Sequence, residues 1–179
     1  MSLGTVYLNV VINRFKAVKN LGDRAMEQLN AQDLHWKQNE ETNSAAIIVK
    51  HMSGNMVSRW TNFFTADGEK PDRSREQEFL NDLGDKAAVM QVWETGWNVL
   101  FRTLHQLTEE DLLKEIYIRG ESHIVLEAIE RQMAHYAYHT GQIVHIGKER
   151  KDAAWKSLSI PRGESETFLK EMLEKHRKS

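Results

Sequence analysis

The chain contains only two prolines, and this scarcity limits the folds open to it more than any other feature. Pro71 and Pro161 both lie in polar stretches between longer segments of periodic sequence. Proline lacks a backbone N–H and interrupts the interior of a helix, so its absence elsewhere permits helices of many turns. We therefore expect long helices joined by polar connectors.

Apolar residues recur every three or four positions in four long segments, as they do on the buried face of a helix. The expected helices cover residues 5–29, 44–64, 84–107 and 122–150, with Ser122 as N-cap of the last. A charged amphipathic segment, residues 164–178, should form a C-terminal helix that covers one edge. Trp60, Trp93 and Trp97 are expected in the core. The pattern predicts an all-α fold, a four-helix bundle with additional short helices.

Length and composition exclude several classes of protein. The 179 residues predict a single domain spanning residues 1–179, and the absence of cysteine excludes disulfides and thiolate ligands. With 24 basic and 26 acidic residues and no basic run, nucleic acid is not an expected partner. No apolar stretch approaches the roughly 20 residues that span a bilayer, and no signal peptide is recognisable. We expect a cytoplasmic protein that does not act at a membrane.

Two histidines are spaced to share one face of the fourth helix. His135 and His139 lie four residues apart, which on an α-helix is a rotation of about 40° and a rise of about 6 Å. The eight histidines of the chain would produce about 0.35 such pairs by chance, so the spacing alone decides little. The polar stripe of this helix lies elsewhere, and both rings should face inward. Buried imidazoles need either hydrogen-bond partners or a metal ion, and both interpretations remain open.

A third histidine, His51, lies near the start of the second expected helix and also faces inward. Taken alone, it is most simply a core histidine bonded to a backbone carbonyl. Helical bundles can also hold a metal ion between side chains of facing helices. The residues therefore permit a site built from His51 and the histidine pair without requiring it.

The chain resembles the DinB-like, or YfiT-like, metalloenzymes over residues 5–150. The resemblance rests on His51, on His135-x-x-x-His139 and on the following Thr140-Gly141-Gln142, with Asn43-Ser44, Asp67-Gly68-Glu69 and Arg73-x-Arg75 in support. It implies that His51, His135 and His139 bind one divalent metal ion, zinc or nickel in related proteins. It also implies a homodimer and, by analogy with some relatives, a reaction in which a low-molecular-weight thiol such as bacillithiol attacks an electrophile.

Other polar residues are candidates for roles around such a site. Gln142 and Asn55, each about one turn beyond a histidine, can accept a hydrogen bond from its ring, although inward-facing amides also tie helices together. Arg59, Arg73 and Arg75, with Glu78, can line the mouth and bind an anionic substrate, or can form a solvated loop surface.

Three neutral imidazoles leave one coordination position of a tetrahedral zinc ion open, as in catalytic zinc sites. A thiol or a water molecule can occupy that position, and the sequence does not choose between them. The leading hypothesis is a thiol-dependent transferase acting on a small molecule. The alternatives are a metal-dependent hydrolase with the same ligands and a noncatalytic bundle that binds a metal or a partner protein.

Overall fold

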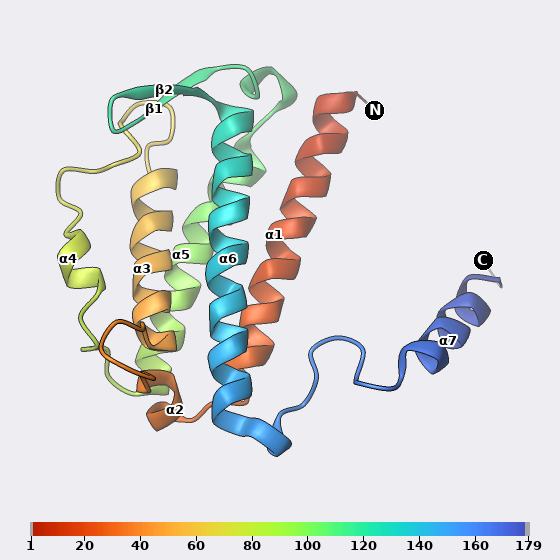
Figure 1. The fold of residues 1–179 in the computed structure, drawn as a ribbon. Coiled ribbons are helices and arrows are strands. Elements are labelled where there is room, and N and C mark those ends of the chain that lie inside the picture. The colour runs from red at the N-terminus through yellow and green to blue at the C-terminus, as the bar shows by residue number, and fades with distance from the viewer. Residues whose placement is uncertain (1, 178–179) are drawn as a thin grey trace.

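The computed structural model describes residues 2–177, and its main body is a bundle of four long helices. These are α1 (Leu3–Glu27), α3 (Ala45–Trp60), α5 (Lys86–Gln106) and α6 (Val125–Lys151). They run side by side, with the most extensive contacts between α3 and α5 and between α1 and α6 (Figure 1). The mostly helical architecture and the C-terminal helix α7 (Ser165–Arg177) confirm the predicted fold class.

Short elements connect the long helices. Helix α2 (Ala31–His35) follows α1, helix α4 (Arg75–Glu78) lies in the long connection between α3 and α5, and 3₁₀ turns cover Glu109–Asp111 and Asp152–Ala154. A two-stranded hairpin, β1 (Glu115–Ile118) and β2 (Glu121–Ile124), crosses the end of the bundle near the N-terminus (Figure 1). Within residues 2–177, no helix has the length and apolar character needed to cross a membrane.

Side-chain caps define where α3 and α5 begin. The side chain of Ser44 accepts a hydrogen bond from the backbone N–H of Ile47, and that of Asp85 accepts one from Ala88. Such caps satisfy backbone donors that have no partner within the helix. They fix the starts of α3 and α5, and the cap at Ser44 places His51 in the second turn of α3.

The core lies between the four long helices and is rich in aromatic side chains. Trp60, Trp93 and Trp97 are each at most 2% exposed, as the sequence predicted. A buried hydrogen-bond chain runs from Trp60 Nε1 to the Tyr136 hydroxyl (3.1 Å) and from that hydroxyl to Asn55 Oδ1 (2.9 Å). It joins α3 to α6 between apolar side chains, where a mismatched polar group would be costly. This chain fixes how the two helices that carry the histidines face each other.

Helix α3 ends at Trp60, four residues before the end predicted from the sequence. Asn62 adopts a left-handed conformation with φ 50°, and its carbonyl accepts hydrogen bonds from Thr65 and Ala66. Asparagine tolerates this conformation better than most residues. Phe63 then stacks on Trp60 with ring centroids 5.0 Å apart and is buried without continuing the helix, whereas Phe64 is exposed.

The prediction that Ser122 caps the fourth helix is wrong, because Ser122 lies in β2 opposite Tyr117 of β1. The two strands are joined by Arg119 and Gly120, both with positive φ (57° and 76°), as a two-residue type I′ hairpin turn requires. Asp67 accepts hydrogen bonds from the backbone N–H groups of Arg119 and Gly120. A distant loop residue therefore stabilises a turn that the local sequence indicates only weakly.

Helix α7 does not cover an edge of the bundle, contrary to expectation. None of its described residues is buried, and Figure 1 shows it projecting away from the four long helices. The preceding connector contains Pro161 and Gly163, the latter with φ 85°, and this segment directs the chain outward. Amphipathic spacing indicated the helix but not a surface on which it could pack.

Candidate metal centre

The structure brings together the three histidines singled out in the sequence. His51 Nε2 of α3 lies 3.4 Å from His135 Nε2 of α6, and His135 Nε2 lies 3.1 Å from His139 Nε2. One nitrogen from each ring lies within 4.8 Å of the other two. Ligand nitrogens about 2.0–2.1 Å from a tetrahedral zinc ion would be about 3.4 Å apart. The donor set and its spacing therefore fit one divalent metal ion.

Two of the rings are oriented by hydrogen bonds at their other nitrogen. His51 Nδ1 donates to Glu78 Oε2 at 3.0 Å, and His139 Nδ1 donates to Gln142 Oε1 at 2.8 Å. A proton on Nδ1 leaves the lone pair of a neutral imidazole on Nε2, which is the nitrogen that faces the other histidines. These contacts select the tautomer that a metal ligand needs.

Burial favours the neutral form of two of the histidines. It lowers the pKa of His135 to about 3, with smaller contributions from the neighbouring His139 and His51. It also lowers the pKa of His139, although the hydrogen bond to Gln142 acts in the opposite direction. His51 is only 7% exposed, whereas His135 and His139 are half-buried. The histidine cluster is therefore closed on the α3 side and reachable from solvent on the α6 side.

The carboxylate that orients His51 is itself held by an arginine. Arg73 donates from Nε to Glu78 Oε1 (2.7 Å) and from Nη2 to Glu78 Oε2 (2.8 Å). Burial alone would raise the pKa of Glu78, but the hydrogen bonds from Arg73 and His51 lower it overall, so the side chain is a carboxylate near neutral pH. Gly54 of α3 leaves room for Glu78, because a Cβ at this position would clash with Oε1.

The other candidate residues divide between supporting contacts and the surface. Gln142 accepts from His139, as expected, but Asn55 accepts from Tyr136, and Glu78 takes the position beside His51 that Asn55 was expected to fill. Arg59 is buried and donates to the Gly68 carbonyl and to Glu69, so it ties a loop to α3 rather than lining a mouth.

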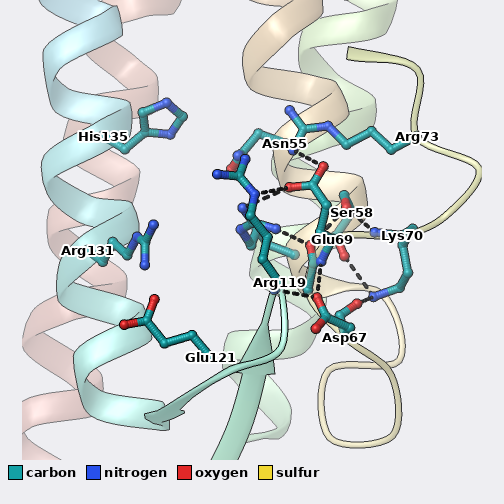
Figure 2. Close-up of polar contacts among 12 residues, drawn as sticks. Asn55, Ser58, Asp67, Glu69, Lys70, Arg73, Arg119, Glu121, Arg131 and His135 are labelled. Carbon is teal, nitrogen blue, oxygen red and sulfur yellow. Dashed lines mark hydrogen bonds and ion pairs between the residues drawn. The ribbon is translucent and has the colours of Figure 1, made fainter.

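Arg73 and Arg75 differ in burial and in their contacts. The side chain of Arg73 is only 5% exposed and bonded to Glu69 and Glu78, whereas Arg75 is exposed on α4. Arg73 therefore offers no free guanidinium to the histidine cluster, and Arg75 is a surface residue of α4. Figure 2 shows His135 pointing from α6 toward the side of the bundle on which Asn55, Glu69 and Arg73 lie.

Sequence reasoning placed Glu78 at a mouth and missed its contact with His51. The two residues are separated by 27 positions, and the contact depends on the path of the connection that includes α4. Arg131, four residues before His135, was not singled out, although that spacing places it on the same face of α6. The four-residue spacing on a helix could have predicted that Arg131 lies beside His135. No feature of the sequence predicts the contact between Glu78 and His51.

A family model described as "Protein of unknown function (DUF1572)" matches residues 2–164. The chain belongs to this family. The DUF1572 match contains all three histidines, Gln142 and Glu78, and ends just before α7 begins at Ser165. A comparison with curated proteins gave no significant match. The family description assigns no activity, so a function has to be argued from the site itself.

Proposed function

We propose that this protein is a metal-dependent enzyme of the DinB-like type, with His51, His135 and His139 binding one divalent ion, zinc or nickel. The observation that carries the proposal is the convergence of three imidazole Nε2 atoms, two of them on rings oriented by Glu78 and Gln142. A DinB-like relationship is supported by a histidine early in the second long helix and a His-x-x-x-His pair in the fourth.

The proposed reaction is the transfer of a low-molecular-weight thiol, such as bacillithiol, to an electrophilic small molecule. A bound divalent ion with an open position would lower the pKa of a coordinated thiol. In such a transfer the thiol sulfur would form a bond to the electrophilic carbon, the leaving group would depart with the electron pair of the broken bond, and the thiol proton would pass to solvent. The half-buried faces of His135 and His139 give such reactants a route to the site.

The chain's own residues would act by holding the site in one arrangement. Glu78 and Gln142 fix two ring orientations, and the buried contact of Tyr136 with Asn55 fixes the faces of α6 and α3. Preorganisation of this kind lowers the cost of assembling a reactive geometry. We also propose that the protein is a homodimer, as related proteins often are, which light scattering in solution would test.

The first experiment measures metal content in protein purified without a histidine tag. We expect about one zinc or nickel ion per wild-type chain and almost none in His135→Ala, with helix content by circular dichroism unchanged. His145→Ala is the matched control, because His145 is exposed on the same helix and should retain the metal. Equal metal content in the wild type and His135→Ala would refute the proposed ligand set.

The second experiment distinguishes the reaction classes. Metal-loaded protein is incubated with bacillithiol and monochlorobimane, which yield a fluorescent thioether, chloride and a proton, and separately with p-nitrophenyl acetate in the absence of thiol. We expect acceleration of the first reaction that is lost in His135→Ala. Acceleration of ester cleavage alone would identify a hydrolase, and bound metal without either activity would favour a noncatalytic bundle.

A further inference from the structure

Arg131 of α6 is a cation beside the histidine cluster without a partner carboxylate. It lies four residues before His135 and therefore on the same helical face. Its side chain contacts His123, with Nη1 3.4 Å from Nε2, and no carboxylate oxygen lies within 4 Å of the guanidinium nitrogens in residues 2–177. Figure 2 shows Arg131 and His135 projecting from α6 into the same space.

Arg119 faces that space from the hairpin turn. Asp67 holds its backbone by accepting its N–H at 2.8 Å, so the residue is anchored although its side chain is 49% exposed. Its Nε donates to Glu69 Oε2 at 3.0 Å, and within the described chain the two terminal nitrogens have no hydrogen-bond partner. Figure 2 shows this side chain next to Glu69, across the space from Arg131.

The arginines around this space outnumber the carboxylates that pair with them. Arg59, Arg73 and Arg119 all bond to Glu69, and within residues 2–177 only Arg73 has a second carboxylate partner, Glu78. Arg59 ties the loop to α3, and Arg73 joins two parts of the connection by bonding to Glu69 and Glu78, so both have a structural role. The terminal nitrogens of Arg119 and the guanidinium of Arg131 have no such structural role, because both side chains are exposed and these nitrogens are not paired with a carboxylate among residues 2–177.

We propose that Arg119 and Arg131 form a binding site for an oxyanion group, a carboxylate or a phosphate, on the small molecule that reaches the histidine cluster. A guanidinium presents donors in a planar fork that matches both groups. Because Arg131 is one turn from His135, an anion held there leaves the rest of the molecule within reach of the histidines. The inference rests on the proposed function for its substrate, but the anion site itself does not require a metal.

Glu121 offers a substitution whose expected effect on anion binding is opposite to that of Arg131. This residue of β2 has an exposed side chain, lies 3.4 Å from His123 Nε2, and is on the same side of the space as Arg131 in Figure 2. A carboxylate at this position repels an incoming anion. Removing its charge should therefore strengthen anion binding, whereas removing the charge of Arg131 should weaken it.

The test uses metal-free full-length protein, so that an anion cannot bind to a metal ion instead. Inorganic phosphate and malonate are titrated separately at low ionic strength, and binding is followed by chemical shifts of backbone amides. We expect saturable binding of at least one probe, weakened about tenfold to a hundredfold in Arg131→Gln and strengthened in Glu121→Gln. Arg75→Gln, which removes an exposed arginine on α4, should match the wild type.

The outcomes separate this inference from the proposed function. Saturation by malonate alone identifies a carboxylate site, and saturation by phosphate alone identifies a phosphate site. Absence of saturable binding, or equal affinities in Arg131→Gln and the wild type, would overturn the inference. Metal binding by Arg131→Gln is measured in parallel. If the wild type binds no metal but Arg131-dependent anion binding persists, the metal-enzyme proposal fails and the anion site stands.

Discussion

Replacing Glu78 with glutamine should weaken metal binding without removing any ligand. Glu78 Oε2 accepts the hydrogen bond from His51 Nδ1 at 3.0 Å, and both side chains are buried. Glutamine can keep a hydrogen bond to the ring but not the negative charge that makes the imidazole a better donor to a metal. Loss of such a partner typically costs about 10–100-fold in metal affinity, equivalent to about 1.4–2.7 kcal/mol.

The same substitution removes the charged partner of Arg73. The side chains of Arg73 and Glu78 are 5% and 7% exposed, so solvent screens their ion pair only weakly. Removing one partner of a buried pair costs about 3–5 kcal/mol. Glu69 stays 3.3 Å from Arg73 Nη1 and partly compensates, so we expect a loss of about 3 kcal/mol in the free energy of unfolding.

Two measurements on the same preparation test both effects. Isothermal titration of metal-free protein with Zn²⁺ gives the affinity, and urea unfolding followed by tryptophan fluorescence gives the stability. Glu76→Gln is the matched control, because Glu76 is exposed on the same short helix and should change neither quantity. Wild-type zinc affinity in a folded Glu78→Gln variant would refute the argument that Glu78 tunes the site through His51.

Two further substitutions extend these tests. Gly54→Ala places a methyl group against Glu78 Oε1 and should weaken zinc binding in the same titration without changing any charge, whereas Gly141→Ala, on an open stretch of α6, should not. Asp33→Asn should destabilise the protein by about 2 kcal/mol at pH 7, because buried Asp33 accepts hydrogen bonds from Arg150 and Lys151. Burial alone would raise the pKa of Asp33, but hydrogen bonds from Lys151, the Asn30 backbone and Arg150 lower it overall. Its stabilising contribution is therefore complete above the unfolded pKa of about 4 and is lost as the pH falls through the lower folded-state pKa. The difference between wild type and Asp33→Asn in urea unfolding should shrink as the pH is lowered from 7 toward 3, and a constant difference would contradict this assignment.

Helical periodicity identified the elements that carry the three histidines but not the contacts that orient them all. His135 and His139 share a face because of their spacing, and Gln142 lies one turn further on, so local geometry sufficed for these residues. The position of Glu78 depends on a connection of irregular structure between α3 and α5, whose path is fixed by ion pairs and loop contacts that have no period. The hairpin was not predicted either, because its turn depends on a contact with Asp67, about fifty residues earlier in the chain.

That connection also couples the hairpin to the histidine cluster. Asp67 holds the turn, Glu69 bonds to Arg119 of that turn and to Arg73, and Arg73 holds Glu78 against His51. Each of these contacts is a hydrogen bond that involves a charged side chain, and hydrogen bonds of this kind are stronger than neutral ones. The hairpin turn is thus joined to His51 through Glu69, Arg73 and Glu78, and Arg59 of α3 ties the same connection to the bundle by bonding to Glu69. An anion bound between Arg119 and Arg131 would contact Arg119, the residue at the hairpin end of this series of contacts.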